Sequence, residues 1–258
     1  MKIISIKLLA LVLACVFALS FVACDKETVQ NDNPSPTEKQ VYLCYTMIDH
    51  YEKCTRTYYY DEYGNELKIV KEDMRGNFLA EWISEYDDNQ NLIKRSVVDT
   101  KNGEPFVQLI QSYDDKGNLI ESRDFSTHGE TVYTYQYDEQ NRVMSRSSNG
   151  TLIETYTYEP DGSYKIQSVN NADEYSVYRA DGKIELLRWG PNTKWVFIYN
   201  DEGFLVECID YNKEIMPKKN VYYLDENGNA IKISQVNSRG IETVMGEYEY
   251  KLYTVKTK

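Results

Sequence analysis

A short pattern that ends in a turn recurs along most of the chain and constrains its fold more than any other feature. Each copy has an aromatic or apolar residue, usually followed by an acid or amide, two polar residues and Gly or a substitute for it. The eight copies begin at Tyr60, Tyr86, Tyr113, Tyr137, Tyr158, Tyr178, Tyr199 and Leu224, at spacings of 20 to 27 residues. Repetition at such a period predicts a repeat architecture.

The residues of each copy are those that favour β-hairpins. Asp or Asn after the aromatic residue accepts backbone hydrogen bonds and nucleates a type I turn. The fifth residue then needs a positive φ, which Gly adopts freely, Asn141 tolerates and Gln90 fits least well. Weaker turn signals, such as Ser148-Asn149-Gly150, lie between the copies. The chain is therefore predicted to be all-β, a repetitive antiparallel β-hairpin meander of roughly sixteen strands.

Aromatic side chains mark one face of the predicted sheet. Trp195, Phe197 and Tyr199 share the parity of the leading tyrosine, as do their counterparts in earlier copies. In the later copies the second face also becomes apolar, for example at Val196 and Ile198. Long flat sheets are unusual, so we expect this one to curl and bury its aromatic face.

The tyrosine–aspartate turn at this spacing resembles the YD repeats of the Rhs-type family, which occurs in bacterial wall and toxin proteins and in animal teneurins. The resemblance covers about residues 55–245. It implies a long β-sheet that winds as a curled or spiral shell. In large members the shell encloses a toxin that is released at an aspartate-containing self-cleavage motif. We identify no such motif here, so we carry over the fold alone.

The N-terminus is predicted to be an export signal. A basic start precedes the apolar run Leu8–Ala23, as in secretory signals. The junction Phe21-Val22-Ala23-Cys24 resembles a bacterial lipobox, in which the cysteine is lipidated and becomes the first residue of the mature chain. Phe21 stands where Leu is commoner in the family pattern. Cys15 is a rival lipidation site, and an uncleaved signal anchor is the alternative.

We therefore expect three segments: a lipoprotein signal peptide over residues 1–23, a lipid-anchored flexible tether over 24–40, and a YD-repeat-like β domain over 41–258. The tether contains Pro34 and Pro36 and lacks aromatic residues. The lipid would hold the exported protein at a membrane of the bacterial cell envelope, with the domain facing outward. A net charge of −12 argues against a nucleic-acid partner, because phosphate binding needs a basic surface.

Three further cysteines follow Cys24. Cys44 and Cys54 flank Asp49-His50, so a hairpin that turned there would allow a disulfide. The interpretation that we favour is two small buried apolar residues. Cys208 lies in an apolar run and is predicted to belong to the core.

Residues with catalytic or metal-binding chemistry are scarce. No motif of serine hydrolases, zinc proteases or nucleotide-binding loops occurs, nor does a zinc-type cysteine spacing. His50 and His128 lie near predicted turns, and we interpret both as exposed turn residues. Asp87-Asp88 and Asp114-Asp115 could make weak calcium contacts, although the repeat already explains them as turn residues. We predict no catalytic residues, no cofactor and no metal site.

Trp189 is the candidate ligand contact. It is a large aromatic residue in a predicted turn, and an exposed tryptophan there would require a partner such as a glycan or a protein.

We prefer a surface-displayed binding or adhesion module without catalytic activity. The alternatives are an envelope scaffold or immunity-like protein that binds another protein, and a carboxylate-based envelope hydrolase. A binding module should have an exposed aromatic or charged patch. A scaffold should have an unpaired sheet edge at a terminus, and a hydrolase should have a pocket with two converging carboxylates.

The lipobox gives a direct test. A Cys24→Ala protein expressed in its bacterial host should incorporate no labelled fatty acid, because the acceptor thiol is absent, while a Cys15→Ala protein should be labelled normally. Label that persists in the Cys24→Ala protein and disappears from the Cys15→Ala protein would move the site to Cys15.

Overall fold

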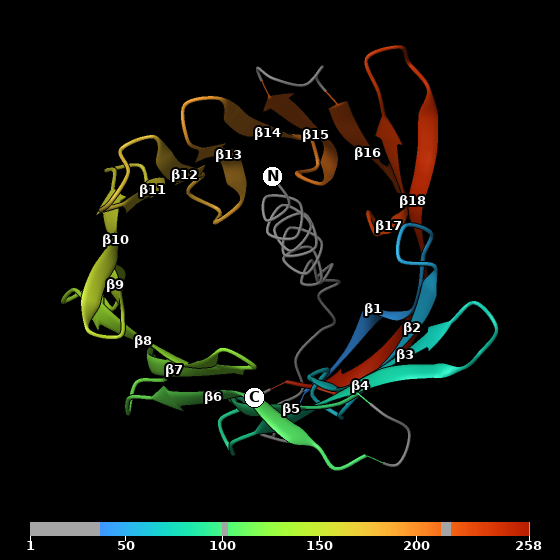
Figure 1. Ribbon diagram of the computed structural model, residues 1–258, viewed down its shortest axis with the longest axis horizontal. Helices are drawn as coiled ribbons and strands as arrows, with labels where there is room; N and C mark the ends of the chain where they lie inside the picture. Colours follow the sequence, from blue (N-terminus) through green and yellow to red (C-terminus); the bar gives the residue numbers. More distant parts are fainter. Residues whose placement is uncertain (1–36, 100–102, 213–217, 258) are drawn as a thin grey trace.

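The computed structural model describes residues 37–99, 103–212 and 218–257, which form one antiparallel sheet (Figure 1). Its eighteen strands are β1 (Glu38–Asp49), β2 (Cys54–Tyr60), β3 (Glu66–Asp73), β4 (Phe78–Tyr86), β5 (Leu92–Val98), β6 (Phe106–Tyr113), β7 (Leu119–Ser126), β8 (Gly129–Tyr137), β9 (Val143–Ser148), β10 (Thr151–Tyr158), β11 (Tyr164–Ser168), β12 (Glu174–Tyr178), β13 (Ile184–Trp189), β14 (Thr193–Tyr199), β15 (Leu205–Asn212), β16 (Lys218–Leu224), β17 (Ala230–Val236) and β18 (Glu242–Lys256). The predicted signal peptide, Cys24 and most of the tether lie outside the described residues. Within the described ranges, no helix has the length and apolar character needed to cross a membrane.

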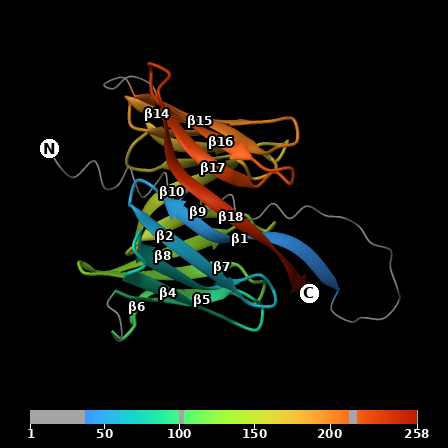
Figure 2. The ribbon, with the colours of Figure 1, turned by 90° about the vertical axis from the view of Figure 1, so that its right-hand side faces the viewer.

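The meander closes on itself. Each strand pairs with the next in sequence, and β18 pairs with β1 from Glu38↔Lys256 to Asp49↔Gly246, so the strands run round a ring in chain order (Figure 1). Figure 2 looks onto these two long strands. The predicted all-β meander is confirmed, and its curl is complete. The eight copies account for β3 to β18, and the hairpin of β1 and β2 adds two strands to the predicted sixteen.

The repeat turns have the predicted geometry. At Asp114 one carboxylate oxygen accepts the N–H groups of Lys116 and Asn118 at 2.9 and 2.8 Å, and the other accepts the Asn118 side-chain amide at 2.9 Å. The Asn118 side chain and these N–H groups lower the pKa of the Asp114 carboxyl. The left-handed position is occupied by Gly117 with φ of 83°, and by Gln90 and Asn141 with φ of 68° and 59°.

Five of the leading tyrosines tie the strand that they end to the strand before it. The hydroxyl of Tyr86 donates to the carbonyl oxygen of Glu66 at 3.0 Å, and that of Tyr113 donates to Leu92 at 2.9 Å. Each acceptor is the first residue of the preceding strand. Tyr137, Tyr158 and Tyr199 make the same bond to Leu119, Val143 and Ile184. The tyrosine of the repeat thus packs its ring on the sheet and satisfies its hydroxyl there.

The buried side chains lie on the concave face of the ring. The described residues form a single sheet, so side chains are shielded from solvent on the side towards which the sheet curves. One cluster consists of Trp195, Phe197, Leu205, Cys208, Tyr222 and Ile233, and a second of Met47, Tyr58 and Ile69. Tyr248 of β18 packs against both clusters and therefore joins them across the closure. Cys208 is a core residue, as predicted.

Cys44 and Cys54 are free thiols. The chain does turn after Asp49, but Cys54 pairs with Asp49, whereas Cys44 pairs with Tyr250 of β18. The two cysteines therefore do not face each other, and the disulfide alternative lacks its geometry. Burial, with a smaller contribution from the charge of Glu66, raises the pKa of the Cys44 thiol to about 12.

Two glycines of the repeat test the turn geometry. Gly117 and Gly228 have φ of 83° and 81°, a conformation that costs a residue with a side chain about 1–2 kcal/mol. An added Cβ at Gly117 meets nothing within 4 Å, whereas at Gly228 it would overlap the ring of Phe204. Urea unfolding should therefore show a loss of about 1 kcal/mol for Gly117→Ala and a larger loss for Gly228→Ala. A neutral Gly117→Ala would show that the turn assignment is wrong.

Candidate ligand-binding site

Trp189 lies at the tip of the hairpin formed by β13 and β14. It is the last residue of β13, pairs with Thr193 and is 48% exposed. Gly190, with φ of 75°, allows the chain to reverse directly after it. The exposed tryptophan at a turn is thus where the sequence predicts it, and its role as a ligand contact stays a prediction.

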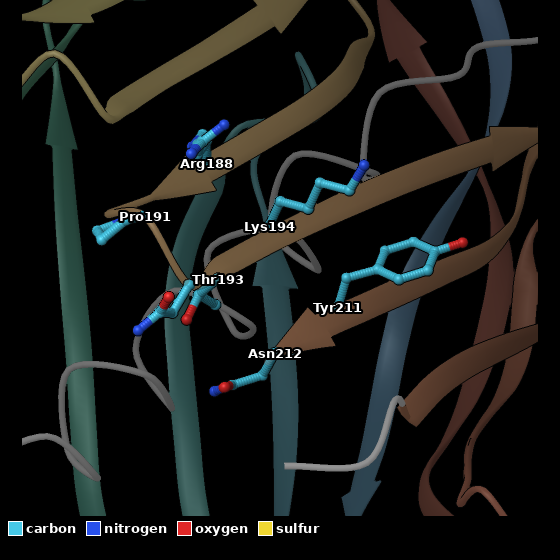
Figure 3. A pocket seen from close by; sticks show the side chains of 7 residues that line it. Arg188, Pro191, Thr193, Lys194, Tyr211 and Asn212 are labelled. Carbon is cyan, nitrogen blue, oxygen red and sulfur yellow. The ribbon is translucent and has the colours of Figure 1, made fainter. Parts of the chain in front are cut away.

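A cavity of about 400 Å³ lies beside this hairpin (Figure 3). Its lining residues are Arg188, Pro191, Asn192, Thr193, Lys194, Tyr211 and Asn212. Side chains alternate along a strand, so Lys194 points away from the face on which its neighbour Trp195 is buried. The long side chains of the lining therefore lie on the face of the sheet opposite the larger core cluster, and Thr193 and Asn212 line the cavity from the ends of β14 and β15.

Strand register brings the charged lining residues together. Arg188 pairs with Lys194 across β13 and β14, and Lys194 pairs with Tyr211 across β14 and β15. The turn at Asn200, whose side chain accepts the N–H of Phe204 at 2.8 Å, connects β14 to β15 and sets the second pairing. Sequence reasoning found the hairpin but missed these three residues, because no local pattern connects them.

The cavity is positively charged. The Arg188 guanidinium donates from Nε to the Gly190 carbonyl at 3.3 Å and pairs through Nη2 with Asp173 at 3.0 Å. The Lys194 ammonium lies 5.1 Å from the centroid of the Tyr211 ring. Among the described residues Lys194 makes no ion pair, so its charge faces the cavity with one aromatic contact.

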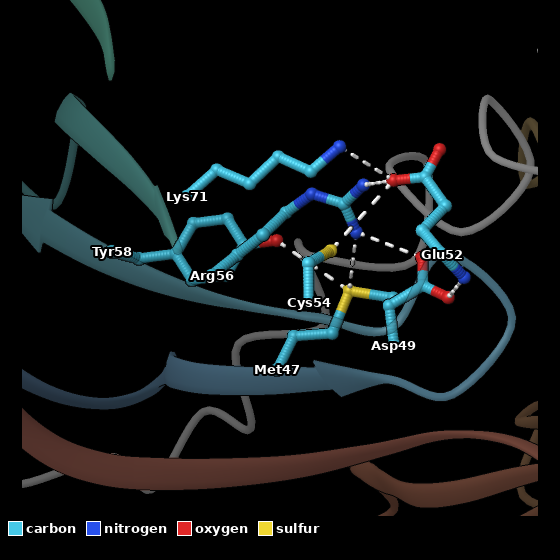
Figure 4. A network of polar contacts seen from close by, with 7 residues as sticks. All are labelled: Met47, Asp49, Glu52, Cys54, Arg56, Tyr58 and Lys71. Carbon is cyan, nitrogen blue, oxygen red and sulfur yellow. Dashed lines mark hydrogen bonds and ion pairs between the residues drawn. The ribbon is translucent and has the colours of Figure 1, made fainter. Parts of the chain in front are cut away.

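A second polar cluster lies at the hairpin of β1 and β2 (Figure 4). Oxygen and sulfur atoms of Asp49, Glu52 and Cys54 lie within 4.8 Å of one another, a spacing that could hold a metal ion. Two cations already contact the carboxylates: Arg56 pairs with Asp49 at 3.1 Å and with Glu52, and Lys71 pairs with Glu52 at 2.8 Å.

The charges in this cluster favour a structural role. Burial opposes the charge of Glu52, but the hydrogen bond from Lys71 and the charges of Arg56 and Lys71 outweigh it and lower the pKa of that carboxyl. A metal ion would have to compete with both cations. We interpret the cluster as an ion-pair network that fixes the first hairpin against β3.

The other candidate residues take part in turns. His50 lies 2.9 Å from Glu247 through Nε2, and His128 lies in the exposed turn between β7 and β8. The Asp87 carboxylate accepts the N–H groups of Asn89 and Asn91, as Asp114 does in its own turn. The histidines are thus turn residues, as predicted, and these aspartates hold hairpins together.

Residues 113–153 match the family described as RHS Repeat. This match confirms the resemblance to RHS repeats over that segment, and the described chain is built as a β-repeat module. No curated protein matches the chain.

Several solved structures resemble the chain weakly, among them the following three. The crystal structure of TcdB2-TccC3-TEV is 14% identical at a TM-score of 0.34, over 81% of this chain and 11% of that one. TcdB2-TccC3 without its hypervariable C-terminal region is 14% identical at a TM-score of 0.32, over 83% of this chain and 12% of that one. A porin-like protein from Bacteroides uniformis is 12% identical at a TM-score of 0.41, over 77% and 91%. The chain thus spans about a tenth of the first two, and these TM-scores are too low to carry an argument.

The structural role of the ion-pair network can be tested by mutation. The side chains of Arg56 and Asp49 are 7% and 5% exposed, and removing one partner of such a buried pair costs about 3–5 kcal/mol. In urea unfolding, Arg56→Met should lower the free energy of unfolding by an amount in this range. The double variant Arg56→Met/Asp49→Asn should regain part of that loss. The matched control is Arg123→Met, whose ion pairs are exposed and whose loss should stay within about 1 kcal/mol. Equal losses at Arg56 and Arg123 would contradict this interpretation.

Proposed function

We propose that this protein is a cell-envelope lipoprotein whose RHS-repeat ring is a binding module without catalytic activity of its own. Lipid on Cys24 anchors it at the membrane, and the tether over residues 24–40 holds the module outward. The repeat architecture supports a structural or binding role, since each copy has the same turn and the same strands rather than a specialised centre.

The observation that carries this proposal is the exposed Trp189 at the tip of a hairpin whose other residues line a cavity. The tip of a hairpin, where β13 ends at Trp189, is available to a large partner. The hairpin projects from the part of the sheet that contains Trp195 and Phe197, both buried in the larger core cluster. A binding site on such rigid strands needs little ordering when its ligand arrives.

Catalysis has less support. A carboxylate-based hydrolase needs two carboxylates that converge in a pocket. The residues that line the cavity include no carboxylate. Asp49 and Glu52 do converge, but Arg56 lies between them and pairs with both.

A scaffold that binds another protein is the second candidate, and one observation favours it. Residues Thr46–Asp49 of β1 pair with β2 on one side and with β18 on the other. The preceding residues of β1 pair with β18 alone among the described strands, so their other side is an open strand edge. A strand with one open side can accept an extended peptide from a partner.

An array of glycans and peptides, probed with the labelled protein, tests the binding function. We expect selective binding to a subset of the array and loss of that binding in Trp189→Ala. Phe106→Ala is the matched control, because Phe106 is also 48% exposed but lies on β6, away from the cavity. Selective binding that survives Trp189→Ala would contradict the assigned site, and an array without any selective signal would contradict the binding function.

A further inference from the structure

Four side chains form a row across the outer face of β12 to β15. Tyr175 pairs with Arg188, Arg188 with Lys194, and Lys194 with Tyr211. Paired residues of antiparallel strands point to the same face of the sheet. Two cations therefore lie side by side between two tyrosines, and three of the four side chains line the cavity.

This arrangement is unfavourable for folding alone. Like charges directly opposite each other on neighbouring strands destabilise a sheet. The chain has a net charge of −12, so acidic residues are plentiful, yet one carboxylate, that of Asp173, contacts this pair of cations in the described part of the chain. An anionic group bound between Arg188 and Lys194 would relieve the repulsion.

The guanidinium is held in place before any ligand binds. The hydrogen bond to Gly190 and the ion pair with Asp173 fix Arg188 at the rim of the cavity. The contact with the Tyr211 ring restricts Lys194 in the same way. Because these side chains are already ordered, little conformational entropy is lost when an anion binds.

The rest of the lining indicates what accompanies the negative charge. Asn192, Thr193 and Asn212 bring amide and hydroxyl groups, which hydrogen-bond to hydroxyls. Tyr211 is 41% exposed and offers a flat ring on which C–H groups can pack. An inorganic anion would use the cations alone, whereas a ligand with a charge, hydroxyls and an apolar ring face would use every part of the lining.

We propose that this cavity binds an acidic saccharide, with its carboxylate or sulfate on Arg188 and Lys194 and its ring against Tyr211. The proposal rests on the binding function above and names the class of ligand. A cavity of about 400 Å³ is in the size range of small-ligand sites. Guanidinium groups bind carboxylate and sulfate oxygens through paired hydrogen bonds, so Arg188 suits either anion.

Titration of the purified protein with four matched sugars, followed by nuclear magnetic resonance, tests this proposal. The charged probes are glucuronate and glucose 6-sulfate. Their neutral counterparts are the methyl ester of glucuronic acid and glucose. We expect saturable binding of at least one charged sugar, at least about tenfold tighter than the two neutral sugars. The stronger of the two charged probes identifies the anion that the site prefers.

Variants connect the binding to the cavity. Arg188→Gln and Lys194→Gln should each lower the affinity for the charged sugar by about tenfold. Lys194→Arg keeps the positive charge and should retain binding. Lys219→Gln is the control, because it removes the same charge from a residue that pairs with Glu207 outside the cavity, and it should bind as the wild type does. Thermal unfolding of each variant checks that the fold persists.

Three outcomes would overturn the proposal. Neutral sugars that bind as tightly as charged ones would remove the need for the cations. Equal weakening by Lys219→Gln and Lys194→Gln would indicate general electrostatics rather than a site. Absence of binding by either charged sugar, while the array shows Trp189-dependent binding of another ligand, would refute the acidic saccharide and leave the binding function standing.

Discussion

An aspartate or asparagine side chain that accepts backbone N–H groups from its own turn fixes the hairpins of the repeat, and the rest of the structure depends on this interaction. In the Asp114 turn the accepted groups lie two and four residues later. These bonds fix the loop length and place one residue in the left-handed conformation, so the strand register is determined. A slip of one residue at the Asn200 turn would exchange Lys194 and Trp195 between the two faces.

Most of the fold can be predicted from the sequence because its determinants are local. The aromatic residue, the turn acid and the left-handed residue lie within a few positions of each other, so each hairpin can be recognised on its own, including the turns at Gln90 and Asn141. Closure of the ring could not be predicted in this way. It depends on pairing between β1 and β18, at opposite ends of the described chain, and no short pattern encodes that contact. The register of Cys44 depends on the same pairing.

The candidate site was half predictable for a related reason. Trp189 could be found because a large aromatic residue next to Gly and Pro is a local signal. Arg188, Lys194 and Tyr211 come from three strands, and their contact follows from two registers, each set by a different turn. To predict such a site, one would need to know which residues of β13, β14 and β15 pair with each other. Knowing where the strands lie in the sequence does not give this register.

The charge of the whole protein and the charge of the cavity have opposite signs, and this contrast bears on selectivity. A net charge of −12 repels anions at long range, but at physiological ionic strength the repulsion is screened beyond about 8 Å. Inside that distance Arg188 and Lys194 dominate, because they lie at the cavity itself. The cations alone would therefore attract simple anions as well. Selectivity for a larger ligand has to come from Tyr211 and the amide groups, which a simple anion does not contact.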